Sequence, residues 1–167
     1  MGKRSVKENK TVYQMIREEL GLSRQAAADL LVFINEDRII RIENGSRPKP
    51  DEITIMAEKY QAPQLLNYYC ANECELGQEY VPQIEIKELP KITLEMLAVM
   101  NRLQKEKDRL IEITYDGEIT EDELPDFVAF EKQLDDMSAV IASLKLWVQT
   151  EIGKERIDRE TYERLGR

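Results

Sequence analysis

Apolar residues recur at helical spacing throughout the first 70 positions of the chain. Val12, Met15, Ile16 and Leu20 are separated by one to four residues on one face, which predicts an amphipathic helix over 12–20. Similar patterns predict four more helices, over 24–31, 36–43, 52–60 and 64–74. Good N-cap residues precede the first four, namely Thr11, Ser23, Asn35 and Asp51. Five such helices would form a compact domain of about 60 residues, near the lower limit for an independent core.

The second half carries two longer patterns. Thr93 is a suitable cap for a helix to about residue 115, and a capping-box pattern over 120–123 precedes the last helix. In that last helix, apolar residues alternate at intervals of three and four, as in a coiled-coil seam. The seam consists of Phe127, Phe130, Leu134, Met137, Ile141, Leu144 and Val148.

This seam predicts dimerisation. A two-helix hairpin cannot fully bury two wide apolar stripes, whereas two hairpins from two chains can do so as a four-helix bundle. We therefore expect a homodimer. The alternative is that the last helix packs only on its own hairpin partner.

Between the halves, two prolines mark a junction. Pro82 and Pro90 flank a segment in which Ile84 and Ile86 alternate with polar residues, which predicts an extended connector or one short strand. We therefore expect an all-α chain in three parts. These are an N-terminal domain over 1–72, a linker over 73–91 and a long-helix hairpin over 92–167.

Charge separates the two halves. The chain has 33 acidic and 24 basic residues, and 23 of the acidic but only 13 of the basic residues lie after position 70. Because phosphate repels carboxylates, the acidic half is not expected to bind nucleic acid, whereas the near-neutral first half with its basic spots could do so. The acidic half could instead contact a protein partner.

The composition excludes several classes of function. The chain has no histidine, so it cannot form a Ser-His-Asp or Cys-His nucleophile system or a histidine-based zinc site, and it lacks glycine-rich phosphate loops. Cys70 and Cys74 are expected to be reduced thiols, with a metal site shared by two chains as the weaker alternative. No apolar run is long enough to span a membrane, and no secretory signal is present. We expect a cytoplasmic protein that is not an enzyme and needs no cofactor or metal.

One motif is specific enough to suggest a family. Leu22-Ser23-Arg24-Gln25 is followed by Ala28, Leu31 and Ile34-Asn35, and the motif ends in Arg41-Ile42-Glu43-Asn44-Gly45. Over about residues 8–70 this resembles the Cro/repressor-type (XRE-like) helix-turn-helix family, whose members have a lambda-repressor-like five-helix fold.

The resemblance implies binding of double-stranded DNA. In that family the helix at 24–31 lies across the DNA backbone and the helix at 36–43 enters the major groove. Carried over by position, the resemblance implies DNA contacts by Arg24, Glu36, Asp37, Arg38, Arg41, Asn44, Arg47 and Lys49.

The chain departs from the family pattern in two places. The turn before residue 36 is one residue longer than usual, and Val32 and Phe33 occupy it in place of the usual glycine. The groove-facing helix also begins with Glu36 and Asp37. These carboxylates could accept hydrogen bonds from cytosine N4, or they could simply favour the helix dipole.

Two hypotheses about function follow. The first is a prokaryotic or phage-type transcriptional regulator that binds DNA as a homodimer, with a basic N-terminal arm of Lys3, Arg4, Lys7 and Lys10 that could follow the DNA or simply be solvated. The alternative is a protein-interaction adaptor whose helix-turn-helix fold no longer binds DNA.

Overall fold

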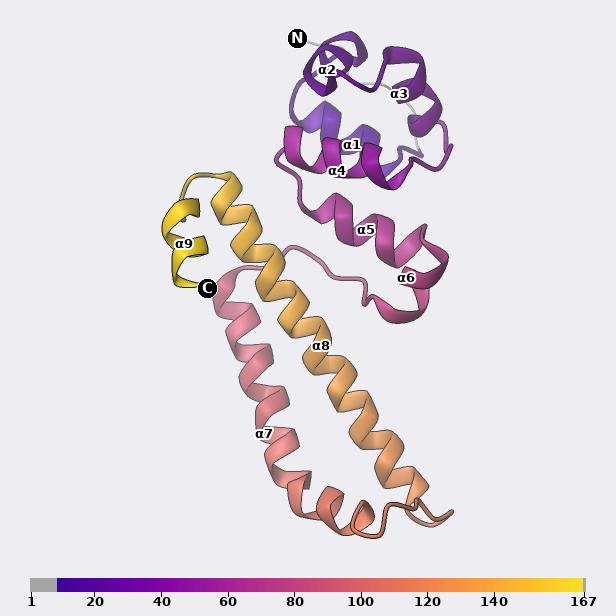
Figure 1. Cartoon of the computed structure of the whole chain (residues 1–167), viewed down its shortest axis with the longest axis vertical. Coiled ribbons are helices and arrows are strands. Elements are labelled where there is room, and N and C mark those ends of the chain that lie inside the picture. Colours follow the sequence, from indigo (N-terminus) through magenta and orange to yellow (C-terminus); the bar gives the residue numbers. More distant parts are fainter. Residues whose placement is uncertain (1–8, 167) are drawn as a thin grey trace. The chain divides into compact units, whose positions relative to one another are not determined.

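The computed structural model describes residues 9–166, and all regular structure in that range is helical (Figure 1). This confirms the all-α fold, with a five-helix arrangement near the N-terminus and two long helices near the C-terminus. The helices are α1 Val12–Glu19, α2 Arg24–Leu31, α3 Glu36–Glu43, α4 Pro50–Lys59, α5 Gln64–Asn72, α6 Glu75–Tyr80, α7 Leu89–Ile113, α8 Leu124–Gly153 and α9 Arg159–Leu165.

The described chain divides into two compact units. The first contains the residues up to Val81 together with those from Gln149 onward, and the second spans Pro82–Val148. The division differs from the expected three parts, because α6 lies within the predicted linker and the C-terminal segment groups with the first unit. The three predicted parts, over 1–72, 73–91 and 92–167, stay a prediction.

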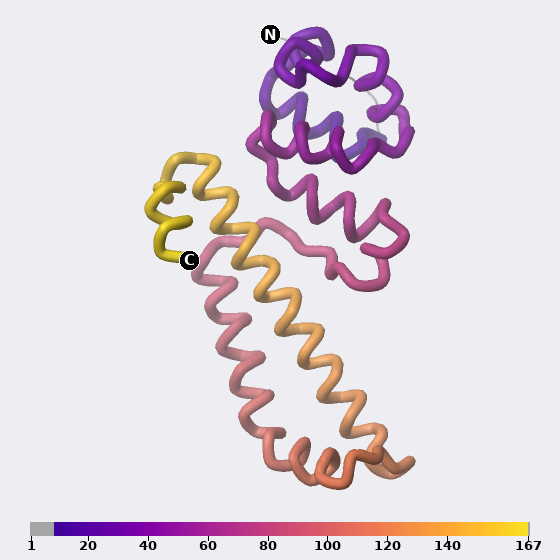
Figure 2. Tube along the Cα trace, viewed as in Figure 1, coloured from indigo at the N-terminus to yellow at the C-terminus, as the bar shows by residue number. Residues whose placement is uncertain are grey.

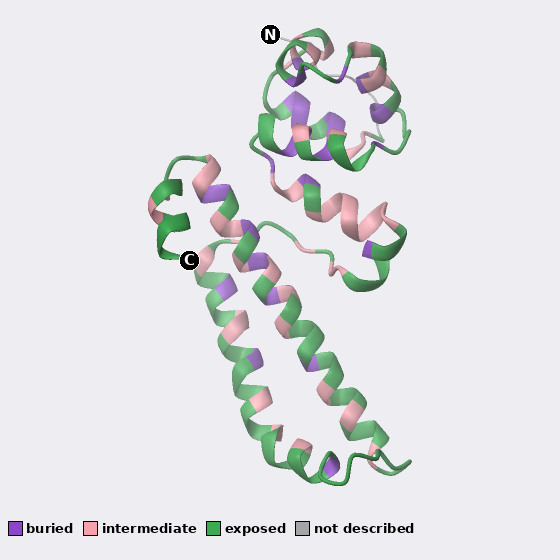
Figure 3. Ribbon diagram, viewed as in Figure 1, coloured by how far each residue is buried: buried purple, intermediate pink, exposed green. Residues whose placement is uncertain are grey.

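Helices α1–α5 enclose one apolar core (Figure 3). Each helix contributes at least one side chain that is almost fully buried, such as Leu31 of α2, Ile39 of α3 and Leu65 of α5. Tyr13 of α1 packs edge-on against Tyr68 of α5, with the ring centroids 5.9 Å apart. The helical spacing in the sequence therefore identifies the buried face of each short helix.

Three of the predicted N-caps are confirmed, and one is wrong. The side chains of Thr11, Ser23 and Asn35 each accept a hydrogen bond from the first turn of the helix that follows. Asp51 does not cap α4, since the helix already begins at Pro50, where proline's fixed φ suits the first turn. Lys49 occupies the cap position, and its backbone N–H donates to the Glu52 carboxylate at 2.7 Å.

The segment between the units contains a helix that the sequence pattern did not predict. The six residues of α6 follow α5 after a break at Glu73 and Cys74. Gly77 is buried against the backbone of Cys70, and a side chain at this position would overlap the Cys70 carbonyl. Residues 82–88 form neither helix nor strand in the structure, so the strand considered there does not form.

Helices α7 and α8 run antiparallel to each other (Figure 2). α7 begins at Leu89 rather than after Thr93, because Pro90 is tolerated in a first helical turn. Thr93 lies inside the helix, where its hydroxyl donates to the Leu89 carbonyl at 3.0 Å. One half of the predicted capping box forms, since the backbone N–H of Thr120 donates to the Glu123 carboxylate at 3.1 Å. The Thr120 hydroxyl donates to the same carboxylate at 2.7 Å rather than accepting from the Glu123 N–H.

Each long helix turns one heptad-spaced stripe toward the other, and we call these the contact stripes. Their buried core consists of Ile92 and Val99 of α7 with Val140 of α8, and partly buried apolar residues surround it. Arg102–Asp136 and Arg109–Asp126 ion pairs, each 2.8 Å long, join the helices farther along. The contact stripe of α7 is Ile92, Met96, Val99, Leu103, Glu106, Leu110 and Ile113, and that of α8 is Asp126, Phe130, Gln133, Met137, Val140, Leu144 and Trp147.

The predicted seam of α8 is divided between two faces of the helix. Phe130, Met137 and Leu144 lie in the contact stripe, as the alternative of packing within one hairpin requires. Leu134 and Ile141 are 49% and 43% exposed, so the hairpin alone does not bury them. Phe127 and Val148 continue the line of these exposed residues at seven-residue spacing.

The turn between α2 and α3 is strained. Val32 has φ 62° and ψ −49°, and the N–H of Phe33 donates to the Leu31 carbonyl at 2.6 Å, which closes a three-residue γ-turn. A β-branched residue rarely adopts a positive φ, because its Cβ crowds the backbone. The strain arises in the turn where the family resemblance implies a glycine that this sequence lacks.

We predict that Val32→Gly stabilises the protein by about 1 kcal/mol. Relief of a strained backbone conformation of this kind contributes about 1–3 kcal/mol. The greater flexibility that glycine gives the unfolded chain offsets part of this gain. Val32 is 72% exposed, so little packing is lost. Urea unfolding measures the change, and Phe33→Gly is the matched control because Phe33 has no positive φ. Equal or lower stability of Val32→Gly would show that the turn is not strained.

Candidate nucleic-acid interface

A buried ion-pair network holds α1, α2 and α3 together. The Glu43 carboxylate at the end of α3 accepts hydrogen bonds from Nε of Arg17 at 2.5 Å and from Nε of Arg24 at 2.8 Å. Arg17 also donates to the Leu22 carbonyl, just before α2. Burial acts to lower the pKa of Arg17, but its hydrogen bonds with Glu43 prevail and raise it. The network therefore fixes how α2 and α3 lie against α1.

Arg24 lies at the start of α2, where the family resemblance places a phosphate contact. Its side chain is 37% exposed, and its Nε is engaged with Glu43. The charge of Arg24 is therefore partly neutralised by Glu43. A phosphate contact by the rest of the guanidinium stays a prediction.

Arg38 is held more firmly. Its guanidinium forms a two-bond ion pair with Glu52 of α4, at 2.7 and 2.6 Å, and also donates to the Ser46 hydroxyl and the Arg47 carbonyl. The hydrogen bonds from Arg38 lower the pKa of Glu52, and the same pair raises the pKa of Arg38. These contacts hold α3 against α4, and a base contact by Arg38 stays a prediction.

The remaining predicted cations and the predicted amide are exposed near the end of α3. Arg41, Asn44, Arg47 and Lys49 all lie at the surface. The Arg41 side chain donates a long hydrogen bond of 3.4 Å to the Asp37 carbonyl. Arg41, Arg47 and Lys49 thus present positive charge that no carboxylate in the described chain neutralises at ion-pair distance.

The two acidic residues lie in the first turn of α3, as expected. Glu36 is half-buried and Asp37 is exposed, and both precede the cations along the same helix. Carboxylates at this end favour the helix dipole by about 0.3–1 kcal/mol. The surface of α3 that would contact DNA is therefore negatively charged at the N-terminal end of the helix and positively charged at its C-terminal end.

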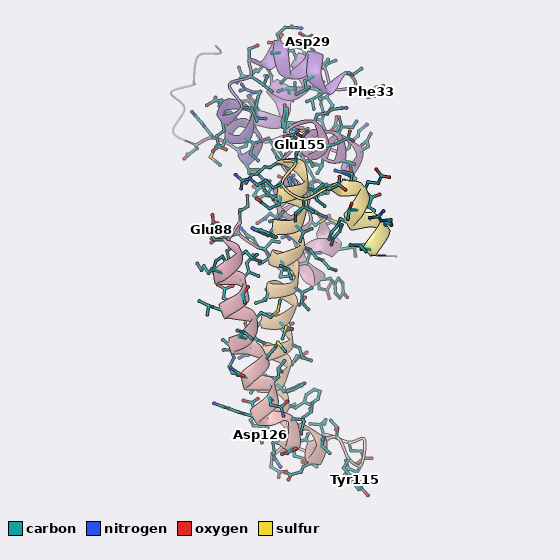
Figure 4. All side chains as sticks on the ribbon, turned by 90° about the vertical axis from the view of Figure 1, so that its left-hand side faces the viewer. Asp29, Phe33, Glu88, Tyr115, Asp126 and Glu155 are labelled. Atoms are coloured by element: carbon teal, nitrogen blue, oxygen red, sulfur yellow. The ribbon has the colours of Figure 1, made fainter. Side chains whose placement is uncertain are left out.

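Sequence reasoning missed two residues that shape this region and the exposure of a third. Arg17 and Glu52 lie on other helices and become partners of Glu43 and Arg38 only in the folded chain. Phe33 is 86% exposed in the turn that leads into α3 (Figure 4). The unusual length of this turn marks Phe33 in the sequence, but the pattern alone does not show how exposed its side chain is.

Most of the basic N-terminal arm, namely Lys3, Arg4 and Lys7, lies outside the described residues. Lys10 is described, and it forms an ion pair with Glu18 of α1 at 2.7 Å. Cys70 and Cys74 are unbonded, half-buried thiols. Over residues 9–166, no group of three candidate ligands could hold a metal ion, and no helix combines the length and apolarity needed to cross a membrane.

Comparison with known families agrees with the geometry. A family model described as helix-turn-helix matches residues 14–63, the segment from α1 to the start of α5. No curated protein and no solved structure gave a significant match.

We predict that Glu52→Gln lowers the free energy of unfolding by about 1–2 kcal/mol at pH 7, because it breaks hydrogen bonds to a charged guanidinium. The pKa of Glu52 is lower in the folded protein than in the unfolded chain. The stabilisation by ionised Glu52 is therefore present at a pH above the unfolded-state pKa and is lost as the pH falls through the folded-state pKa. Urea unfolding from pH 7 to pH 3 should therefore show the two proteins converging in acid. Glu58→Gln, at an exposed carboxylate, should match the unmodified protein, and an undiminished gap at pH 3 would contradict the prediction.

Proposed function

Residues 14–63 form a helix-turn-helix domain of the Cro/XRE type, and from this we propose that the chain is a sequence-specific transcriptional regulator that binds double-stranded DNA as a homodimer. The observation that carries the proposal is the capped α2–α3 pair within the matched segment, with unneutralised cations at the end of α3. A regulator of prokaryotic or phage type would act in the cytoplasm. No enzymatic role follows from this domain.

The contacts within the domain divide the expected DNA-binding residues into two groups. Arg41, Asn44, Arg47 and Lys49 are exposed and suited to contact bases and phosphates directly. Arg24 and Arg38 act mainly by positioning α2 and α3, since carboxylates already engage them. Glu36 and Asp37 would then select sequence by accepting from cytosine N4 or by rejecting other bases.

The start of α3 also favours a second candidate. Glu36 and Asp37 repel phosphate, and two of the nearby arginines are neutralised within the fold. A domain with this charge arrangement could have become a protein-interaction adaptor. DNA binding is therefore the property to measure.

In vitro selection from random duplex DNA at about 100 mM salt, with the full chain, tests the proposed function; binding through a few phosphate contacts survives this salt concentration. We expect enrichment of a two-fold-symmetric motif, because a symmetric dimer presents two equal domains. Enrichment of cytosine opposite α3 would assign base reading to Glu36 and Asp37. A folded dimer that enriches no sequence would support the adaptor instead.

We predict that Arg41→Ala weakens binding to the selected site by about 1–3 kcal/mol, the usual loss for one base-reading arginine. Because Arg41 is exposed, its loss should leave the melting temperature unchanged. Titration of labelled duplex at moderate salt measures the affinity. Lys59→Ala, at an exposed lysine of α4, is the matched control, and an unchanged affinity for Arg41→Ala would remove that residue from the interface.

A further inference from the structure

The helical hairpin leaves one apolar face uncovered. On α8, residues 127, 131, 134, 138, 141, 145 and 148 each follow a contact-stripe residue by one position, so they form a second heptad-spaced line, which we call the flank stripe. Apolar residues occupy every second position of this line. They are the exposed Leu134 and Ile141 and the half-buried Phe127 and Val148.

The α7 helix continues this apolar face. Leu97, Met100 and Ile111 are 50%, 52% and 57% exposed, and each also follows a contact-stripe residue by one position. One position is a rotation of roughly 100° about the helix axis. On each helix the exposed line lies one residue after the contact stripe. Because the two helices run in opposite directions, this one-residue step places both exposed lines on the same side of the hairpin.

The polar members of the flank stripe have a definite charge order. Glu131 lies toward the tip of the hairpin, Ser138 lies in the middle and Lys145 lies toward the base, and all three are exposed. No ion pair is found for Glu131 or Lys145 within residues 9–166. The stripe therefore carries one negative and one positive charge at nearly equal distances from its centre.

We propose that a second copy of the chain covers this face, with the two α8 helices antiparallel and crossing near Ser138. In that register Leu134 meets Ile141 of the other copy, and Phe127 meets Val148. Glu131 then faces Lys145 of the other copy on both sides of the two-fold axis. This inference rests on the proposed homodimer and specifies its interface and direction.

Charge disfavours the parallel arrangement. Parallel stripes would place Glu131 against Glu131 and Lys145 against Lys145, and like charges directly opposed destabilise a helix pair. Parallel hairpins would also bring together two segments 112–131, each with eight acidic and no basic residues. The antiparallel register separates these acidic tips, which include the exposed Tyr115 and Asp126 (Figure 4).

Single cysteines test the direction. In full-length protein with Cys70→Ser and Cys74→Ser, a short bismaleimide should join two copies of Ser138→Cys, which lie together at the axis. Lys145→Cys alone and Glu131→Cys alone should not crosslink, since like positions lie about 21 Å apart. A mixture of these two variants should crosslink, whereas Asp135→Cys, exposed on another face, should not. Circular dichroism confirms folding of each variant.

The outcomes separate the possibilities. Efficient crosslinking of Lys145→Cys or Glu131→Cys alone would overturn the antiparallel register in favour of a parallel one. A dimer in sedimentation without crosslinking at Ser138→Cys would overturn the flank stripe as the interface, and a monomer in sedimentation would overturn the homodimer as well. Crosslinking at Ser138→Cys by a protein that selects no DNA would leave this inference standing and reject the regulator.

A second variant pair tests the apolar contacts. Ile141→Asp should raise the dissociation constant of the dimer at least about 30-fold, the loss typical of a central interface residue. Leu94→Asp is the matched control, because Leu94 is 69% exposed on a different face of α7. Equal effects of the two changes, measured by sedimentation equilibrium, would contradict the assignment.

Discussion

The orientation of the three N-terminal helices depends on one buried carboxylate. Glu43 ends α3 and accepts hydrogen bonds from arginines of α1 and α2, so the three helices share a single polar centre within an apolar core. Removing one member would leave a buried charge unpaired, which typically destabilises a protein by about 3–5 kcal/mol. The α2–α3 geometry that would dock on DNA is therefore set by electrostatics inside the domain rather than by the α2–α3 turn, which is strained.

Local signals predicted much of this fold from sequence. Apolar spacing gave α1–α5 and the two long helices, and the side chains of Ser23 and Asn35 cap α2 and α3 as expected. Short elements escaped prediction because six or seven residues, as in α6 and α9, carry too little periodic pattern. The division of the α8 seam also escaped prediction, since residues three and four apart can serve two neighbouring faces of a helix.

The limit of prediction from sequence is clearer at the candidate site. Position in the motif predicted DNA contacts for Arg24, Arg38 and Arg41 alike, because residue spacing indicates where a side chain is attached and not which groups it contacts. Their partners, Glu43 and Glu52, are 19 and 14 residues away along the chain. Only the folded structure separates the arginines bound within the domain from the one that faces solvent. Likewise, the charges of the second half indicate an interface only when the structure places Glu131 and Lys145 on one face of α8.

The Arg38–Glu52 pair has a consequence for how such a domain could change its affinity. The carboxylate that fastens α3 to α4 also cancels a positive charge beside the surface proposed to meet DNA. A neutral residue there would free the guanidinium for phosphate but loosen the helix that carries it. Tighter binding and thermal robustness therefore oppose each other at a single position. Variants selected for tighter DNA binding should include temperature-sensitive ones, and a compensating change elsewhere in the core would be needed to keep both properties.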